Sequence, residues 1–278
     1  MSTVIAIIGG TGLDDPTIVT NRKELEDIED TPWGEPSTIF KGEVNGETVF
    51  IQSRHGRLHN KSPSQVNYCA NLWALKRLGV THIVATTACG SLKEEYSPGD
   101  LVVLSDYIDM TKGYRVNTHV GTAVENGGPK GIIHLPSKPA YDEDLREILI
   151  ESLKESGVDH KTQGTAVCIE GPRFSSYAES CIFRDVYKAE IVNMTACPET
   201  SIAREMGMHY ASIAMVTDYD CWKENEEVNV ANVTKQMLIN AKSVGKVVPI
   251  IIRKIKEQDW RKSRESLLAA VKTAIMEC

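Results

Sequence analysis

The chain has 278 residues, of which 41% are hydrophobic and 25% are charged, and its formal net charge at pH 7 is -7. This length and composition are those of an ordinary globular protein, which excludes a disordered or fibrous chain. The acidic balance, without clusters of Lys and Arg interleaved with aromatic side chains, argues against nucleic acid as a partner.

Short runs rich in Val and Ile recur along the chain, as is typical of strands buried on both faces. They cover residues 4–8, 49–51, 83–87, 101–104, 165–169, 191–194 and 210–217. Segments with helical periodicity lie between several of them, at residues 64–78, 142–155, 198–206 and 230–255, and residues 263–276 predict an amphipathic terminal helix. The alternation predicts an α/β fold in which a central mixed or parallel sheet is flanked by helices.

Helix boundaries carry their own signals. Pro63 and Ser64 are expected to open a helix, Gly79 to follow its C-terminal end, and Pro198 to lie in the first turn of another. No repeat, low-complexity tract or proline-rich linker divides the chain, so we expect one domain spanning residues 1–278. Residues 109–139, rich in Gly and polar side chains, predict a long excursion of the kind that often carries function.

The cysteines and the apolar runs indicate the compartment. The seven cysteines include no Cys-x-x-Cys pair, so neither a disulfide framework nor a zinc site is indicated. No leader is recognisable, and no apolar run approaches the roughly 20 residues that span a bilayer, so no membrane partner is expected. We expect a cytoplasmic protein with reduced thiols, with the nucleus as an additional location.

Glycine-bearing turns follow three of the predicted strands, at residues 9–12, 53–56 and 88–91. Glycine lets the backbone approach a ligand closely, and ligands of open α/β sheets lie at the carboxyl ends of strands. One such turn alone is more often a connector, but three together predict a shared site. The first turn has neither a dinucleotide fingerprint nor a Walker lysine. Thr11 with its neighbouring N–H groups can hold one phosphate, to which Arg54 adds a cation and His55 a donor.

Two carboxylates, Asp218 and Asp220, follow the last predicted strand. Carboxylates separated by one residue can converge at a strand end, which raises the pKa of one of them and makes it a proton donor near neutral pH. The alternative is that they only cap the following turn. A metal site is not indicated, since no His or acidic partner lies at a ligand-like spacing.

Six blocks at these strand ends, residues 7–13, 54–57, 86–91, 170–176, 193–195 and 211–222, run in the same order as in a known family. Across nearly the whole chain, the sequence resembles the trimeric purine nucleoside phosphorylase family, and within it the branch that cleaves methylthioadenosine. The resemblance implies a large mixed sheet, a homotrimer, no metal or organic cofactor, and inorganic phosphate as co-substrate.

The resemblance also implies roles for individual residues. Phosphate would be held by Gly10, Thr11, Arg54, His55, Thr87, Ala88 and Thr195. The base and ribose would contact Ala88, Cys89, Gly90, Phe174, Ser175, Met194, Thr217 and Asp220. Val230 and Val233 would form an apolar wall for a 5′-methylthio group, and His134 would close the 5′ pocket of a neighbouring subunit. Asp218 would supply the proton to N7 of the base and accept a hydrogen bond from its 6-amino group.

The expected activity is therefore that of a pentosyltransferase of purine and methionine salvage, which converts 5′-methylthioadenosine and phosphate into adenine and 5-methylthioribose-1-phosphate. A broader phosphorylase that also cleaves adenosine is an alternative, because Thr234 stands where the family pattern has leucine. A non-catalytic dinucleotide-binding module has residues 9–12 as its only support. A nucleoside hydrolase lacks the Asp cluster of a calcium site.

Overall fold

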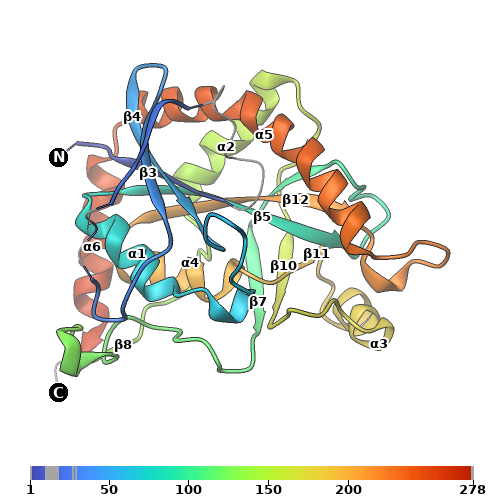
Figure 1. The fold of residues 1–278 in the computed structure, drawn as a ribbon, viewed down its shortest axis with the longest axis horizontal. Coiled ribbons are helices and arrows are strands. Elements are labelled where there is room, and N and C mark those ends of the chain that lie inside the picture. Colours follow the sequence, from blue (N-terminus) through green and yellow to red (C-terminus); the bar gives the residue numbers. More distant parts are fainter. Residues whose placement is uncertain (1, 10–18, 27, 29, 277–278) are drawn as a thin grey trace.

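The computed structural model describes residues 2–9, 19–26, 28 and 30–276, and within them eleven strands form one sheet with helices on both faces (Figure 1). The strands of this sheet are β1 (Ile5–Gly9), β2 (Thr20–Glu24), β3 (Ile39–Val44), β4 (Glu47–Ser53), β5 (His82–Ser91), β6 (Leu101–Val103), β7 (Asp106–Met110), β9 (His160–Lys161), β10 (Thr165–Ile169), β11 (Ile191–Asn193) and β12 (His209–Asp218). The α-helices are α1 (Tyr68–Arg77), α2 (Glu143–Ser156), α3 (Tyr177–Cys181), α4 (Ala196–Glu205), α5 (Val230–Glu257) and α6 (Arg261–Ala274).

The sheet is mixed, which confirms the predicted fold class. Its main path runs β2-β3-β4-β1-β5-β11-β10-β7, and β12 lies against the other edge of β5. Strand β5 is parallel to β1 and β12 but antiparallel to β11. The parallel pairs of this kind need crossover connections, which the helices between the strands provide.

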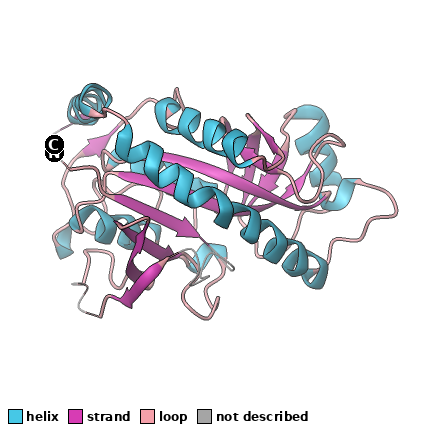
Figure 2. Ribbon diagram, turned by 90° about the horizontal axis from the view of Figure 1, so that it is seen from above, coloured by secondary structure: helices cyan, strands magenta, loops and turns pink. Residues whose placement is uncertain are grey.

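Burial explains why the central strands have no polar face. All five residues of β1 are buried, as are nine of the ten in β5 and nine of the ten in β12. Helices α1 and α4 cover one face of the sheet and α2 and α5 the other, so both sides of these strands pack against apolar side chains (Figures 1 and 2). Each large side chain buried this way contributes roughly 1.5–3 kcal/mol to folding.

Helix α5 is the longest element and crosses the sheet diagonally (Figure 2). Asn229 caps its first turn, since the side chain accepts a hydrogen bond from the Asn232 N–H. Its buried residues begin at Asn240, whose amide Nδ2 donates to the Val216 carbonyl of β12 at 2.8 Å. The helix is thus anchored to the sheet by its C-terminal part, while its first turns project beyond the sheet.

Two predicted helices have different limits in the structure. The helix expected from residue 64 starts at Tyr68, because Asn67 caps it by accepting from the Ala70 N–H; Pro63–Gln65 form a separate 3-10 turn. At the other end of the chain, the predicted helix to residue 276 stops at Ala274. The last described residues form strand β13 (Ile275–Met276), which pairs with β8 (Ile132–Ile133) in the excursion.

No described helix is both long enough and apolar enough to cross a bilayer.

Candidate active site

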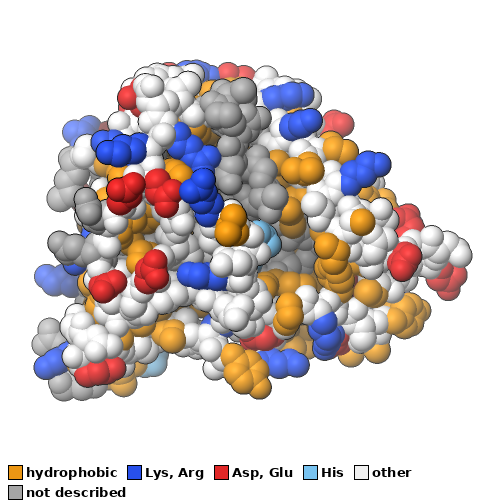
Figure 3. Space-filling model, in the orientation of Figure 1, with side chains coloured by type: hydrophobic (Ala, Val, Ile, Leu, Met, Phe, Trp, Pro, Cys, Tyr) orange, Lys and Arg blue, Asp and Glu red, His pale blue; other side chains and the backbone are white. Residues whose placement is uncertain are grey.

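A cavity of about 540 Å³ lies at the carboxyl ends of β5, β11 and β12, and its mouth is visible as a hollow near the centre of Figure 3. Its position follows from how β5 changes partners. Residues His82–Ala85 pair with β1, and Gly90 and Ser91 pair with β11. The segment between them, residues 86–89, lines the cavity. Such a switch between neighbours is where ligands bind in α/β sheets.

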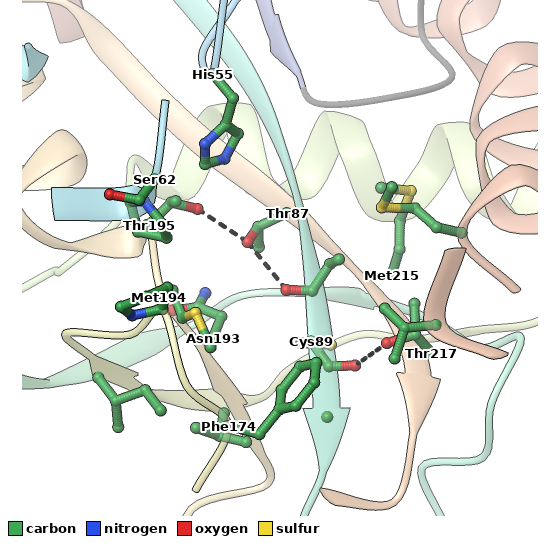
Figure 4. A pocket seen from close by; sticks show the side chains of 18 of the residues that line it. His55, Ser62, Thr87, Cys89, Phe174, Asn193, Met194, Thr195, Met215 and Thr217 are labelled. Carbon is green, nitrogen blue, oxygen red and sulfur yellow. Dashed lines mark hydrogen bonds between the residues drawn. The ribbon is translucent and has the colours of Figure 1, made fainter. Parts of the chain in front are cut away.

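Most of the predicted site residues border this one cavity. They are Arg54, His55, Thr87, Ala88, Cys89, Gly90, Phe174, Ser175, Met194, Thr195, Thr217, Asp218, Asp220, Val230 and Val233. Figure 4 shows that His55, Thr195 and Thr87 lie toward one end of it. Phe174, Cys89 and Thr217 lie toward the other end, with Met194 and Asn193 between. Five of the six blocks of sequence, together with residues 230–233, therefore meet in one place.

Three predicted site residues are not among the described residues that line the cavity. Gly10 and Thr11 lie outside the described residues. His134 is exposed, directly after β8 in the excursion, and is not among the residues lining the cavity. This place is compatible with the implied role of His134, which concerns the pocket of another subunit.

Hydroxyl and guanidinium groups make up the end of the cavity near β4, which we call the anion end: Arg54, His55, Thr87 and Thr195. The Thr87 and Thr195 hydroxyls are 3.1 Å apart and both side chains are buried. Arg54, only 2% exposed, follows β4 directly and its backbone N–H donates to the Gly9 carbonyl of β1. Two strand ends thus hold the backbone of Arg54 in place.

His55 is neutral at pH 7 in this setting. Burial, assisted by the adjacent Arg54 charge, lowers the pKa of His55 to about 4. Its Nδ1 lies 2.9 Å from the Lys61 carbonyl oxygen, and because a carbonyl can only accept, Nδ1 carries the proton. The Nε2 atom of the neutral ring therefore holds a lone pair.

The opposite end, which we call the carboxylate end, contains Asp218 and Asp220. Asp218 accepts hydrogen bonds from the Thr217 hydroxyl at 2.7 Å and from the Asp220 N–H at 2.8 Å. Burial nevertheless raises the pKa of Asp218 and likewise that of Asp220. The two carboxyl groups do more than cap a turn, because both line the cavity. A carboxyl with a raised pKa can hold a proton nearer neutral pH.

Gly90 is required by the closeness of these acids. A Cβ atom at this position would be 3.0 Å from Asp218 Oδ1, 3.1 Å from Asp220 Cβ and 3.3 Å from Val192 Cγ1. These distances are shorter than ordinary van der Waals contact, so a larger residue would displace the acidic side chains. Gly90 therefore leaves room for the side chains of Asp218 and Asp220 at the carboxylate end.

Arg115, in the excursion, fixes one wall of the cavity although sequence analysis gave it no role. Its guanidinium pairs with Glu170 at 2.9 Å and donates to the carbonyls of Met194 at 2.8 Å and Cys197 at 2.7 Å. Because the side chain is 6% exposed, these bonds hold the chain around Met194 against the end of β10. In the sequence, Arg115 is one arginine in a long polar loop. Arginines in such loops are too common for this one to be recognised as part of a site.

Several other lining residues were also missed. They are His59, Asn60, Lys61, Ser62, Pro63, Gln65, Thr86, Ile169, Pro172, Val192, Asn193, Met215, Thr234 and Met237. Asn193 stands out because it is 3% exposed and neither polar atom of its amide has a partner among the described residues. A buried amide in this condition is well suited to a polar ligand. Asn193 belongs to residues 193–195, one of the six blocks through which the sequence resembles the phosphorylase family, so the block was noticed although this residue was given no role.

Residues of α5 form the apolar side of the cavity. Val230, Val233 and Met237 line it from the first turns of the helix, and Thr234 places one hydroxyl-bearing side chain among them. Among the described residues, no group of three or more His, Cys, Asp or Glu side chains is arranged to hold a metal ion. The cavity thus joins an anion end, a carboxylate end and an apolar wall.

Comparison with known proteins gives consistent results. A sequence model described as "Phosphorylase superfamily" matches residues 4–253. The S-methyl-5′-thioadenosine phosphorylase of Drosophila melanogaster is 45% identical over 92% of this chain and 87% of its own length. That of Xenopus tropicalis is 44% identical over 98% of this chain and 96% of its own.

Solved structures are similar over the whole chain. A methylthioadenosine phosphorylase from Schistosoma mansoni in complex with adenine has a TM-score of 0.91 and 39% identity, with 99% of each chain covered. A variant of the adenosine/methylthioadenosine phosphorylase from the same organism, in complex with methylthioadenosine, has a TM-score of 0.90 at 39% identity, also with 99% of each chain covered.

Proposed function

Because the chain belongs to the phosphorylase superfamily and, within it, to the S-methyl-5′-thioadenosine phosphorylases, we propose that it splits 5′-methylthioadenosine with inorganic phosphate. The products are adenine and 5-methylthioribose-1-phosphate, which makes the protein a pentosyltransferase. One observation supports this function above the others: the anion end and the carboxylate end border a single cavity with an apolar wall between. That combination suits a reaction between phosphate and a purine nucleoside.

Phosphate occupies the anion end in this proposal. Arg54 and the hydroxyls of Thr87 and Thr195 donate to its oxygens, and Gly10, Thr11 and Ala88 are assigned to the same subsite. His55 Nε2 holds a lone pair, so its contact with phosphate needs one proton, either on a phosphate oxygen or taken up by the ring. No metal or organic cofactor is needed for these contacts.

The nucleoside lies beside phosphate with its base at the carboxylate end. Phe174 and Ser175 flank the base, while Asp220 and the strand residues Ala88, Cys89, Gly90 and Thr217 enclose it. Met194 packs against ribose, and Val230 and Val233 contact the methylthio group. The Arg115 bond to the Met194 carbonyl supports this assignment, since it fixes the backbone under the sugar.

The chemistry follows from charge. Breaking the N-glycosidic bond leaves positive charge on ribose and negative charge on the base. A phosphate anion next to the anomeric carbon stabilises the first of these, the positive charge on ribose. Asp218, whose pKa is raised by burial, supplies the proton to N7 that stabilises the second. Phosphate then forms its bond on the face opposite the departing base, so the anomeric centre is inverted without a covalent enzyme intermediate.

Recognition of adenine has the same origin. The carboxylate of Asp218 or Asp220 accepts from a 6-amino group, whereas a 6-oxo group would place lone pair against lone pair in a buried site. Such an unpaired contact costs on the order of 1–3 kcal/mol. Adenine nucleosides are therefore favoured over those of hypoxanthine.

The quaternary structure and location are part of the same proposal. A homotrimer would allow His134 of one subunit to reach the 5′ pocket of the next, which fits its exposed position in the excursion. The described cysteines form no disulfide, which fits a reducing compartment such as the cytoplasm.

A substrate panel with and without phosphate tests the function. We expect phosphate-dependent release of adenine from 5′-methylthioadenosine, with adenosine cleaved less efficiently and inosine hardly at all. Product formed without phosphate would instead indicate a hydrolase, and equal efficiency on adenosine would indicate a broader phosphorylase. Failure to cleave any nucleoside would leave a binding module as the remaining function.

A further inference from the structure

The Arg54 guanidinium is bound from behind by a buried acid. Its Nε lies 2.6 Å from Glu199 Oε2 and its Nη2 lies 2.7 Å from Glu199 Oε1, which is a two-pronged ion pair. Its Nη1 donates to the Thr86 carbonyl at 2.9 Å. A guanidinium has five N–H donors. Three of them are thus used within the described part of the chain, leaving one on each Nη for a ligand.

Glu199 is itself held in one position. It lies on α4 and is 1% exposed, and its Oε1 also accepts a hydrogen bond from the Tyr210 hydroxyl at 2.7 Å. Tyr210 belongs to β12 and is 1% exposed. A carboxylate bound this way from a helix and a strand fixes the plane of the guanidinium, because the two-pronged pair permits little rotation.

The pair also determines the charge of the anion end. Glu199 cancels the positive charge of Arg54, and the adjacent His55 is neutral at pH 7 because its pKa is lowered to about 4. Among the described residues, His59 and Lys61 are the other basic side chains beside this end: burial lowers the pKa of His59, whose ring lies 4.5 Å from that of His55, and Lys61 is half-buried. A phosphate placed here is held mainly by directed N–H and O–H donors and retains more of its negative charge than it would beside an uncompensated arginine.

We propose that Glu199 is a positioning residue for the phosphate subsite, which holds two Arg54 N–H groups toward the cavity and cancels the arginine charge. An anion that is oriented but only partly neutralised is the better nucleophile, and it also stabilises positive charge on ribose more effectively. Glu199 thereby gives up phosphate affinity in favour of the rate of the chemical step. This inference rests on the proposed use of phosphate as co-substrate.

Glu199→Gln tests the inference, since it removes the charge and keeps the shape. We expect kcat to fall about tenfold or more, the range for a lost charge-assisted hydrogen bond, while KM for phosphate falls or stays the same. In thermal melts without nucleoside, inorganic phosphate should raise the Tm of this variant more than that of the unmodified protein, because the anion replaces the missing counter-charge.

Two further variants separate positioning from stability. Tyr210→Phe retains the Glu199 charge and loses one hydrogen bond, so we expect a severalfold lower kcat without any gain in the phosphate-induced Tm shift. Glu155→Gln is the matched control, because Glu155 pairs with Arg253 and Lys254 on the surface. Glu155→Gln should change neither kcat nor the phosphate-induced Tm shift.

Three outcomes would overturn the inference. One is an unchanged kcat in a folded Glu199→Gln protein, another is a phosphate-induced Tm shift no larger than that of the unmodified protein, and the third is a raised KM for phosphate. If Glu199→Gln does not fold, a Tyr210→Phe protein with unaltered kcat would overturn it as well. Failure of the proposed function is distinguishable, because the unmodified protein would then release no adenine in response to phosphate.

Discussion

Strands β5 and β12 lie side by side over their whole length and carry buried polar groups at both ends, but the two ends are built differently. At the N-terminal end, the rings of His82 and His209 stack with centroids 4.6 Å apart, and Trp260 packs edge-on against His82 at 4.2 Å. At the C-terminal end, Thr87 and Asp218 border the cavity. We call these the closed end and the open end of the strands.

Both ends contain buried polar atoms without a partner among the described residues. At the closed end these are Nε2 of His82 and of His209; at the open end they include Oγ1 of Thr86 and both amide atoms of Asn193, which line the cavity. An unpaired buried atom therefore does not by itself mark a functional site. What distinguishes the open end is space for a ligand and acids whose pKa is raised, whereas aromatic packing fills the closed end. Substitutions at the open end should alter activity, and those at the closed end stability.

The largest effect is expected for Asp218→Asn. Loss of the proton donor should lower kcat on methylthioadenosine about 10²–10⁴-fold, the usual contribution of a general acid. The relative use of inosine should rise, because an amide can donate to a 6-oxo group. Steady-state kinetics with both nucleosides measures the change, and Asp220→Asn is the comparison variant. An unchanged ratio between the two substrates would contradict the role of Asp218.

Stability should respond to Asp218→Asn in the opposite sense. Because burial raises the pKa of this acid, its ionised form opposes folding, and this cost grows as pH rises above the usual carboxyl range. The neutral Asn avoids it. We expect the free energy of unfolding at pH 7 to stay the same or to increase.

A smaller effect is expected for Gly90→Ala, which crowds the open end without removing a functional group. Its Cβ would press on Asp218 and Asp220, so kcat should fall roughly tenfold to a hundredfold and stability by about 1–3 kcal/mol. Gly46→Ala is the control, because φ at Gly46 is +77° while no atom lies within 4 Å of the new Cβ. That strained turn should lose stability at unchanged kcat. Equal kcat values for the two variants would contradict the crowding.

The smallest effect concerns the closed end. Burial, and to a lesser extent the nearby His209, lowers the pKa of His82 to about 2. Below pH 6.5, His82 therefore binds a proton in the unfolded chain but stays neutral in the folded protein. The free energy of unfolding therefore has its full value above pH 6.5 as far as His82 is concerned, and it decreases as pH falls below 6.5, because protonation of His82 stabilises the unfolded chain. His82→Phe should therefore reduce the loss of unfolding free energy between pH 6.5 and 5.5 by about 1 kcal/mol.

Denaturant titrations at the two pH values measure this difference. The Thr81 hydroxyl can keep its hydrogen bond to the Val4 carbonyl in the variant, and a Phe ring retains an aromatic face for stacking on His209 and for the edge-on contact with Trp260. His160→Gln, on the half-buried strand β9, serves as the control and should retain the acid sensitivity of the unmodified protein. Activity at pH 7.5 should be unchanged in both, and a large loss of kcat in His82→Phe would break the distinction between the two ends.

The sequence predicted the parts of the fold and site that depend on buried, continuous apolar runs. Strand β10 has the predicted limits, and the residues that follow β4 do meet residues 88–90 at one cavity. Residues 88–91 were expected to form a turn, but they continue strand β5, because β11 and β12 pair with them. Strand β2, with the sequence TNRKE, was not foreseen because it is an edge strand whose side chains face water. Edge strands need no apolar alternation, so their sequence resembles that of a loop.

Long-range contacts explain what else was missed. Glu199 lies in a helix and Arg115 in a loop, and only the folded chain brings them to Arg54 and Met194. Periodicity reports which face of an element is buried but not which distant residue it meets. The same holds for β13, because nothing in residues 275–276 indicates a partner at residues 132–133.

The place of β12 in the sheet has a consequence for biosynthesis. Residues His82–Gly90 of strand β5 pair with β12, which begins at His209, about three quarters of the way along the chain. The N-terminal half of the chain emerges from the ribosome first. The apolar edge of β5 therefore stays unpaired until β12 has been synthesised. Late pairing of this type slows folding and exposes an edge to aggregation. The nascent protein is therefore expected to depend on chaperones more than a protein whose central strands are adjacent in sequence.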